Sequence, residues 1–539
     1  MDAVTRPPAP VNEPVLDYAP GSAERAALSS ALAEFSAPVE LPAIIGGRPR
    51  RPSGEAFDVV APFDHARVLG HSAHGGKDDA QAAVDAALAA APGWRALSFD
   101  DRAAILLRAA DLLTGPWRAR INAATMLGQA KTSYQAEIDA ACELADFWRF
   151  NVHFARELLA EQPIAHSRGV WNRTDHRPLE GFVYAVTPFN FTAIAGNLPT
   201  APALMGNVVI WKPSPTQQLA ASAIMDLLVE AGLPDGVINL VPGAGPDISQ
   251  VLLAHPDLAG IHFTGSTRVF QGLWKTVGDN ISRYRSYPRL VGETGGKDFV
   301  LAHESADIDV VRTALVRGAF EYSGQKCSAA SRAYLPRPLF ARLRNELIAA
   351  TEAVEVGSVE DFSNFTSAVI DDRAFARLRT ALDRAAAAPG IEVLAGGSYD
   401  DSVGYFVTPT LLLGEDPTDE IFTTEYFGPI LSLHVYDDFE TVLGQVDSAS
   451  PYALTGSIIA RDRNAVATAS AALRFTAGNF YVNDKPTGAV VGQQPFGGAR
   501  ASGTNDKAGS AANLARWTSP RSIKETFGAP TSVPYPHQG

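Results

Sequence analysis

The spacing of apolar residues predicts helices through the first third of the chain. From Lys77 to Leu113 the sequence is rich in alanine at helical spacing, and Ser98, with an acid three residues later, has the pattern of a helix N-cap. A second helical stretch runs from Tyr134 to Phe154. Residues 1–40 are rich in proline, which indicates an extended arm with one short helix around Glu24–Phe35.

Further along, short apolar runs alternate with helical segments. The predicted strands are Phe182–Val186, Val208–Trp211, Val237–Val241 and Gly260–Phe263, and the helices among them are Gln217–Ala231 and Pro246–Ala254. A second alternation from Phe299 to about Asp484 includes helices at Ile308–Tyr322, Pro338–Val354 and Asp372–Ala387. Such alternation indicates βαβ units and parallel sheets, so we expect two α/β lobes. Trp517–Phe527 has the alternation of a strand.

One long run, Gly181 to Trp211, contains no charged residue and exceeds the roughly 20 residues that span a bilayer. Pro188, Asn190, Asn197 and other prolines and asparagines interrupt it, and these would break a helix and leave polar groups unpaired in lipid. We therefore expect a buried strand, loop and helix, and no membrane association.

The composition narrows the class of protein. The 539 residues include 45 Lys and Arg against 59 Asp and Glu, a formal net charge of −14, which argues against nucleic acid and anionic membranes as partners. The two cysteines, Cys142 and Cys327, allow no disulfide framework and no Cys-x-x-Cys metal motif. The N-terminus has an early acid and no apolar targeting segment. We expect a folded, soluble, cytoplasmic protein without a bound metal.

The loops after three predicted strands have the chemistry of a nucleotide site. Lys212 and Ser214 follow one strand, the turn Gly243-Ala244-Gly245 follows the next, and Gly265-Ser266 follows another. Open parallel sheets bind ligands beyond the carboxyl ends of their strands, and a helix N-terminus suits a phosphate. Each loop alone is equally an ordinary turn or helix cap, so the prediction depends on their joint placement.

Cys327 and Glu293 are candidate catalytic residues. Cys327 lies among small residues between a helix and a strand, where a thiol can be partly exposed, although most cysteines are inert core residues, as we expect for Cys142. Glu293 lies among glycines between the two lobes, where it is either a general base or a solvated acid in a surface turn.

Six motifs occur in one order across about 240 residues. They are Phe189-Asn190-Phe191, Lys212-Pro213-Ser214, Phe263-Thr264-Gly265-Ser266, Gly292-Glu293-Thr294-Gly295-Gly296-Lys297, Gly324-Gln325-Lys326-Cys327 and Glu425-Tyr426-Phe427-Gly428-Pro429. The series resembles the aldehyde dehydrogenase superfamily from about residue 40 to the end. Within it, Phe189–Ile194, Asn483–Gly488, the run Gly492–Asp506 and Arg516–Thr526 resemble the subgroup of Δ1-pyrroline-5-carboxylate dehydrogenases.

The resemblance implies catalytic roles for three residues. Cys327 attacks the aldehyde, Asn190 and the Cys327 backbone N–H hold the oxyanion, and Glu293 deprotonates the water that hydrolyses the thioester. The implied activity is NAD-dependent oxidation of L-glutamate γ-semialdehyde to L-glutamate in proline catabolism. A dehydrogenase for another carboxylated aldehyde and a redox-silent homologue remain the alternatives.

The resemblance also implies binding residues. The cofactor-binding set, with NAD as cofactor, is Lys212, Ser214, Gly265, Ser266, Thr294, Glu425 and Phe427. Pro215 stands where some NAD-specific relatives place an acid, so the preference for NAD over NADP depends on the subgroup. The substrate-binding set is Ser328, Gly488, Ala489, Phe191 and Phe496, with Ser328 and the 488–489 backbone on the substrate carboxylate.

Together these predictions describe an α/β protein of the aldehyde dehydrogenase type, with a Rossmann-type NAD lobe, a catalytic thiol lobe and a small β oligomerisation flap. The expected divisions are an N-terminal arm (1–40), the NAD-binding domain (41–164 and 184–292), the flap and tail (165–183 and 509–539) and the catalytic domain (293–508). We expect a protruding β-hairpin within His166–Val186 and Trp517–Phe527 pairing against a neighbour. The expected partners are the small-molecule substrate, further copies in a dimer or larger homo-oligomer, and a separate proline dehydrogenase.

Overall fold

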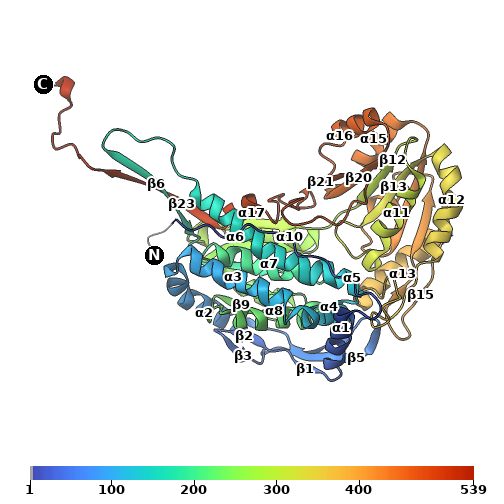
Figure 1. Ribbon diagram of the computed structural model, residues 1–539, viewed down its shortest axis with the longest axis horizontal. Helices are drawn as coiled ribbons and strands as arrows, with labels where there is room; N and C mark the ends of the chain where they lie inside the picture. The colour runs from blue at the N-terminus through green and yellow to red at the C-terminus, as the bar shows by residue number, and fades with distance from the viewer. Residues whose placement is uncertain (1–3, 539) are drawn as a thin grey trace.

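The computed structural model describes residues 4–538, so residues 1–3 of the predicted arm and residue 539 of the predicted tail lie outside it. The chain forms two lobes, one blue to green and one yellow to orange, and a two-stranded ribbon that projects from the first lobe (Figure 1). The fold is therefore the predicted two-lobed α/β architecture with a small β extension.

A seven-stranded sheet forms the centre of the first lobe, in the order β11-β10-β7-β8-β9-β2-β3. Its strands are β2 (Ala43–Ile45), β3 (Arg48–Arg50), β7 (Phe182–Val186), β8 (Val208–Lys212), β9 (Ile238–Leu240), β10 (Leu258–Thr264) and β11 (Arg289–Glu293). Strands β7 to β11 are parallel to one another, and β2 and β3 are antiparallel additions at one edge. All four predicted strands of this lobe are therefore present.

Helices surround this sheet and bury it. They are α1 (Ala23–Glu34), α2 (Lys77–Ala96), α3 (Phe99–Thr114), α4 (Arg118–Gln129), α5 (Ser133–Ala136), α6 (Leu144–Ala160), α7 (Thr192–Leu204), α8 (Gln218–Ala231), α9 (Gly245–Ala254) and α10 (Thr267–Asp279). The π-helical turn η1 (Glu137–Glu143) joins α5 to α6, inside the stretch predicted as continuous helix. Ser98 caps α3 as predicted, since its hydroxyl accepts from Asp101 N. A small sheet, β1 (Val39–Glu40), β4 (Ala56–Ala61) and β5 (Asp64–Ala73), lies beside α1 and α4 (Figure 1).

The second lobe contains another seven-stranded sheet, in the order β14-β17-β18-β13-β12-β20-β21. Its strands are β12 (Asp298–Ala302), β13 (Ala330–Pro336), β14 (Ile391–Ala395), β17 (Thr410–Gly414), β18 (Ile430–Tyr436), β20 (Thr455–Ile459) and β21 (Asn479–Val482). Its helices are α11 (Ile308–Phe320), α12 (Arg337–Glu352), α13 (Asp372–Ala387), α14 (Glu420–Thr423), α15 (Phe439–Ser448) and α16 (Arg463–Ala472). Only the edge strand β14 is antiparallel to its neighbour, so this sheet is also predominantly parallel.

The smaller elements complete the chain. They are β15 (Tyr399–Asp400), β16 (Phe406–Val407), β19 (Tyr452–Ala453), β22 (Ala499–Arg500), α17 (Ala511–Ala515) and the 3-10 turns η2 (Pro215–Gln217), η3 (Ile281–Arg283), η4 (Glu321–Gly324) and η5 (Pro536–Gln538).

The projecting ribbon differs from the predicted hairpin. Its strands are β6 (Val170–Pro178) and β23 (Thr518–Thr526), which pair antiparallel within this chain over their full length. The expected hairpin within His166–Val186 is absent, because the apolar strand Phe182–Val186 is buried in the central sheet instead. The strand predicted near Trp517–Phe527 is present, and its partner is β6 of the same chain.

The uncharged run Gly181–Trp211 lies in the core of the first lobe as β7, α7 and β8, where almost all of its side chains are buried. This matches the predicted strand, loop and helix. Over residues 4–538, no helix has both the length and the apolar character required to cross a membrane.

Candidate active site

Four neighbouring parallel strands of the first lobe end close together, and predicted site residues occupy these ends. Asn190 lies in the loop after β7, Lys212 is the last residue of β8, Gly265 and Ser266 follow β10, and Glu293 ends β11. Because the carboxyl ends of adjacent parallel strands meet at one edge of a sheet, residues far apart in the sequence share one surface. The second lobe supplies Cys327 to this region.

Cys327 lies in the turn between η4 and β13, and contacts from both lobes hold this turn. The Asn190 side-chain amide donates from Nδ2 to the backbone oxygen of Gln325 at 3.0 Å. Gly296 lies against the turn from the other side, where a side-chain β-carbon would come within 2.6 Å of the Cys327 oxygen. The amide of Asn190 is therefore placed two residues from the thiol, with its second N–H free of this bond.

The environment of the Cys327 thiol favours its protonated form. Burial raises the pKa of the thiol first, and the carboxylates of Asp298, Glu293 and Glu425 raise it further. The side chain nevertheless keeps some exposure to solvent. A thiol in such surroundings becomes a nucleophile when a base accepts its proton. A carboxylate within electrostatic reach of the thiol can serve as that base.

Glu293 is such a carboxylate. Burial raises its pKa well above the usual range, while Gly498 N, which donates to Oε2 at 3.1 Å, and the charge of Lys507 oppose the shift. A carboxylate with a raised pKa can both accept and release a proton near neutral pH. The charge of Glu293 contributes to the raised pKa of Cys327, so the predicted base lies within electrostatic reach of the predicted nucleophile.

The residues predicted for the adenosine side of a cofactor lie at β8. Lys212 is buried, burial lowers its pKa to about 8, and Nζ donates to Gly243 O at 3.2 Å. The Ser214 hydroxyl is 3.0 Å from Thr216 Oγ1. Ser266 caps α10, and the other N–H groups of that first turn can face an anion. Among residues 4–538, the Lys212 ammonium has no carboxylate partner. Together with the Ser214 hydroxyl and the N-terminus of α10, it supplies hydrogen-bond donors that suit ribose and diphosphate groups.

The residues predicted for the nicotinamide side lie nearer the thiol. Gly296 N donates to Glu425 Oε1 at 2.8 Å, and burial raises the pKa of Glu425 to about 7. Phe427 adopts a positive φ of 54°, and Thr294 donates to Ala501 O at 2.6 Å. Glu425 retains acceptor capacity on its other carboxylate oxygen, which suits a ribose diol. The residues present thus fit NAD.

The predicted substrate residues Ser328, Gly488 and Ala489 are linked by a hydrogen bond close to the thiol turn. Ser328 Oγ is 2.8 Å from the hydroxyl of Thr487, the residue before Gly488. Gly488 has a φ of +100°, a conformation that favours glycine, and Ala489 follows it. Phe496 forms a short antiparallel bridge with Ala508. The hydrogen bond between Ser328 and Thr487 therefore connects the residue next to Cys327 with the 488–489 loop.

Phe191 is held by a buried ion pair that the sequence prediction missed. Lys131 Nζ lies 4.0 Å from the centre of the Phe191 ring and 2.6 Å from Asp139 Oδ2. Asp139 in turn accepts from Thr192 N and Ala193 N, the first residues of α7. The ion pair therefore fixes the helix start that directly follows Asn190 and Phe191.

Glu143 is a second residue absent from the prediction. Burial and the Asp139 charge raise its pKa well above the usual range, and it acts electrostatically on Tyr481 together with Cys327. Asp139, Glu143 and Asp146 are spaced four and three apart in a helical stretch that is otherwise largely apolar. Such a row of acids on one face could have been recognised as a signal of a polar site.

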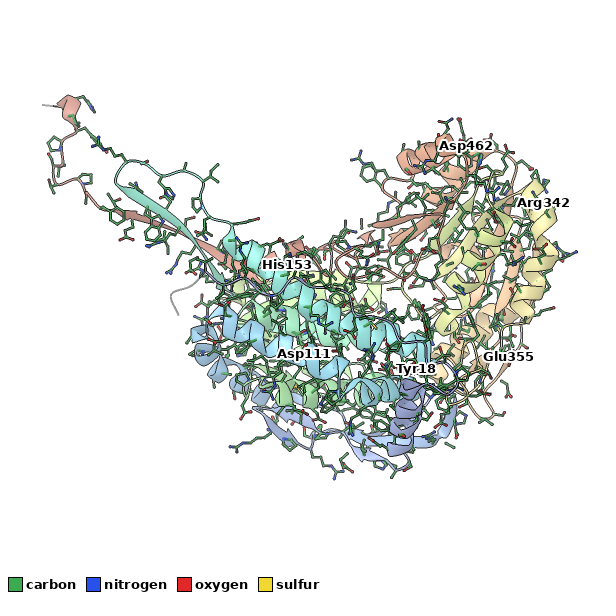
Figure 2. All side chains as sticks on the ribbon, in the orientation of Figure 1. Tyr18, Asp111, His153, Arg342, Glu355 and Asp462 are labelled. Carbon is green, nitrogen blue, oxygen red and sulfur yellow. The ribbon has the colours of Figure 1, made fainter. Side chains whose placement is uncertain are left out.

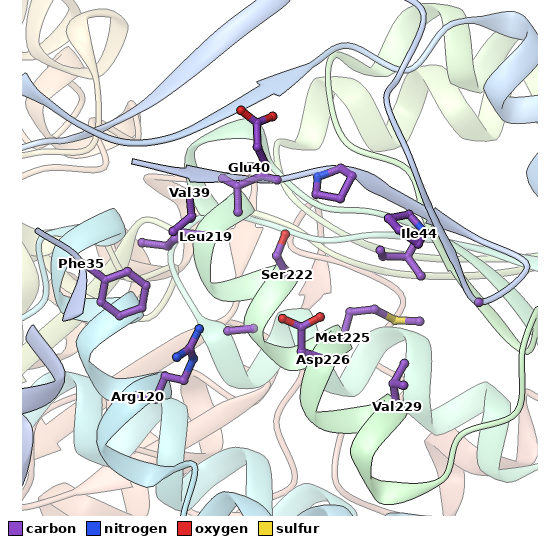
Figure 3. Close-up of a pocket in the computed structure, with 15 residues that line it drawn as sticks. Phe35, Val39, Glu40, Ile44, Arg120, Leu219, Ser222, Met225, Asp226 and Val229 are labelled. Carbon is purple, nitrogen blue, oxygen red and sulfur yellow. The ribbon is translucent and has the colours of Figure 1, made fainter. Parts of the chain in front are cut away.

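A surface pocket of about 450 Å³ lies elsewhere, between α8 and the segment around β1 and β2 (Figure 3). Its lining includes Phe35, Ile44, Met225 and Val229 and contains none of the predicted site residues. This pocket is therefore separate from the region of the thiol.

Comparison with known proteins identifies the family. The aldehyde dehydrogenase family model matches residues 50–523, and the chain belongs to that family. A probable delta-1-pyrroline-5-carboxylate dehydrogenase of Schizosaccharomyces pombe is 50% identical over 537 residues, covering 98% of each chain. The mitochondrial delta-1-pyrroline-5-carboxylate dehydrogenase of Homo sapiens is 49% identical over 519 residues, covering 96% of this chain and 92% of that one. The crystal structure of the Delta-pyrroline-5-carboxylate dehydrogenase from Mycobacterium tuberculosis bound with NAD matches with a TM-score of 0.97, 62% identity and full coverage of both chains.

Proposed function

We propose that this protein oxidises L-glutamate γ-semialdehyde, the hydrolysed form of Δ1-pyrroline-5-carboxylate, to L-glutamate with NAD⁺ as oxidant, the second step of proline catabolism. One observation supports the reaction type: the Cys327 thiol, the Asn190 amide and the Glu293 carboxylate, whose pKa is raised, come together at the junction of the two lobes. The names of relatives that match over nearly the full chain support the substrate.

The first chemical step belongs to Cys327. Its thiol gives up a proton to the Glu293 carboxylate and Sγ adds to the aldehyde carbon, so that a C–S bond forms and the carbonyl oxygen becomes an oxyanion. The free N–H of the Asn190 amide stabilises that oxyanion, and the bond to Gln325 O keeps the amide oriented toward the turn. NAD⁺, when bound, accepts hydride and thereby supplies the oxidising power.

The second step belongs to Glu293. The thioester on Cys327 is hydrolysed by water, and the carboxylate of Glu293 accepts the proton of that water as it attacks. The raised pKa makes Glu293 a better base than an ordinary carboxylate, provided that the pH is high enough to ionise it. Cleavage of the C–S bond releases L-glutamate and restores the thiol.

Binding roles follow the same division. We infer that Lys212, Ser214, Gly265 and Ser266 hold the adenosine and diphosphate part of NAD, while Thr294, Glu425 and Phe427 hold the nicotinamide riboside. On the substrate side, Ser328 and the backbone N–H groups of Gly488 and Ala489 receive the α-carboxylate, and Phe191 and Phe496 form the walls. The Ser328–Thr487 contact supports this arrangement, since it places the serine hydroxyl beside the loop.

The assembly and location of the protein are part of the proposal. The β6–β23 ribbon projects from the first lobe (Figure 1), and we infer that it pairs with another copy to form a dimer or larger closed oligomer. Both cysteines are free, which is consistent with a reducing compartment, and we propose the cytoplasm. Since the human relative is named as mitochondrial, cell fractionation is the deciding measurement. A separate proline dehydrogenase would supply the substrate.

Replacement of Cys327 tests the reaction. Cys327→Ala should abolish NADH formation from Δ1-pyrroline-5-carboxylate and should also abolish labelling of the site by iodoacetamide. Cys142→Ala serves as the matched control, because burial raises the pKa of that thiol, and its hydrogen-bond partners are Pro14 O and the Glu137 carboxylate and not groups of the Cys327 turn. NADH formation by Cys327→Ala at the wild-type rate would contradict the proposal.

A further inference from the structure

The N-terminal segment before α1 is bound to α4, η1 and α6 of the first lobe. Glu13 N donates to Asp146 Oδ1 of α6 at 2.8 Å, and the Glu13 carboxylate bridges Arg118 and Arg149. Tyr18 OH donates to Glu137 of η1 at 2.7 Å. Figure 2 shows Tyr18 at the end of the first lobe nearest the second. Residues 12–18, here called the strap, are thus held by charged and polar groups throughout.

Asn12 connects the strap to the substrate loop. Its Nδ2 donates both to Asp146 Oδ2 and to the backbone oxygen of Val491, each at 2.8 Å. Its Oδ1 accepts from Gln493 Nε2 at 3.0 Å. A side-chain amide has two N–H donors and one carbonyl oxygen, so every polar group of the Asn12 side chain is engaged. Two of its three partners belong to a loop almost 480 residues away in the sequence.

That loop is seated tightly on α6. The Val491 side chain is buried in the core of the first lobe. At Gly492, where φ is +81°, a β-carbon would come within 2.1 Å of the Phe150 ring of α6. Close contact without a side chain indicates that the backbone position at 491–492 is set against this helix. Asn12 joins the loop to Asp146 on that same helix.

The loop is also fixed at its other end. Thr487 is bonded to Ser328, next to the nucleophile. Residues 488–490 therefore lie between a contact to the thiol turn and the contacts of Asn12, and Val490 is also hydrogen-bonded to Gln493 and Gln494 on the side of Asn12. A shift at either end changes the positions of the N–H groups of Gly488 and Ala489.

We propose that Asn12 is a positioning residue for substrate recognition: by joining the 491–493 backbone to α6, it holds the 488–489 N–H groups where the substrate α-carboxylate is bound. This inference rests on the proposed function only for the identity of the carboxylate ligand. The strap thereby contributes to specificity for carboxylated aldehydes without touching the substrate.

The test compares Asn12→Ala with wild type on two aldehydes. Glutamate γ-semialdehyde carries the α-carboxylate and propanal does not, so KM for the first should rise about tenfold, as expected from the loss of one well-placed hydrogen bond to a charged group. For propanal, kcat/KM should stay within about twofold, because its recognition does not use the loop. Hydrogen exchange by mass spectrometry should show faster exchange in peptides covering residues 488–494.

Three further variants distinguish a specific effect of Asn12 from misfolding and nonspecific effects. Val11→Ala alters an exposed side chain of the same segment and should leave both KM values and loop exchange unchanged. Gln493→Ala removes one partner of Asn12 and should raise KM for the semialdehyde by a smaller factor. The double variant Asn12→Ala/Gln493→Ala should be no worse than Asn12→Ala alone, since contacting residues are coupled.

The outcomes separate this inference from the proposed function. Unchanged exchange of the loop in Asn12→Ala, or equal losses on the two aldehydes, would overturn the role of Asn12. A wild-type enzyme that fails to prefer glutamate γ-semialdehyde would overturn the proposed substrate, while loop exchange in Asn12→Ala would still decide whether the strap holds the loop.

Discussion

Removal of the Asn190 side chain is the sharpest test of the oxyanion site. The side chain is buried, and one N–H of its amide is engaged by Gln325 O at 3.0 Å, which leaves the other for the developing oxyanion. Asn190→Ala removes both. Loss of one oxyanion donor lowers kcat by about 10²–10³, equivalent to about 3–4 kcal/mol of transition-state stabilisation. The measurement is steady-state NADH formation from Δ1-pyrroline-5-carboxylate at saturating NAD⁺.

A matched variant separates catalysis from stability. Asn239 is also buried in the first lobe, donates from Nδ2 to Gly236 O at 2.8 Å and accepts from Gly46 N at 2.9 Å. Asn239→Ala should therefore cost comparable folding free energy, about 1–3 kcal/mol, while kcat stays near the wild-type value. If Asn190→Ala keeps kcat within threefold of wild type, or if both variants lose kcat equally, the assignment of the oxyanion donor is wrong.

Three other predictions concern neighbouring groups. Burial raises the pKa of Glu293, and only its ionised form is a base, so kcat should rise with pH through an ionisation above the usual glutamate range. Glu293→Gln should lower kcat by about 10²–10⁴ and remove that ionisation from the pH profile of kcat. Ser328→Ala should raise KM for glutamate γ-semialdehyde by about tenfold and leave propanal unaffected, and equal changes for both would contradict its carboxylate role. Lys131→Met should lower the free energy of unfolding by about 3–5 kcal/mol, because it leaves the Asp139 carboxylate buried without its counter-charge. In urea denaturation, Lys131→Met/Asp139→Asn should show a smaller loss of this free energy. Equal losses in the two variants would refute this explanation.

Many of the long helices and the central strands of the first lobe could be predicted from local pattern. Helix α13 begins and ends where its helical spacing indicated, and the strands predicted in the first lobe are short, mostly apolar runs that are almost entirely buried. The placement of Lys212 and Ser266 along one sheet edge also followed, because parallel strands end at the same edge, whereas β11, the strand that brings Glu293 to that edge, was not among the predicted strands.

The features that could not be predicted depend on contacts distant in the sequence. The π-helical turn η1 interrupts a stretch whose apolar spacing indicated continuous helix, and Asp139 within it pairs with Lys131 from the loop after α4. The partner of β6 is β23, about 350 residues later, so local alternation could not distinguish this pairing from a hairpin. The contacts of Asn12 with Val491 and Gln493 likewise follow no sequence periodicity.

The relative rate of NADH formation on a panel of aldehydes tests the central claim most directly. Purified protein should show a kcat/KM for glutamate γ-semialdehyde at least about 100-fold above those for succinate semialdehyde and propanal, since the α-carboxylate adds charge-assisted hydrogen bonds to Ser328 and the 488–489 backbone. NADP⁺ measured alongside NAD⁺ should give the lower rate. Equal kcat/KM values across the panel would contradict the proposed substrate, and no NADH formation from any aldehyde would contradict the proposed reaction.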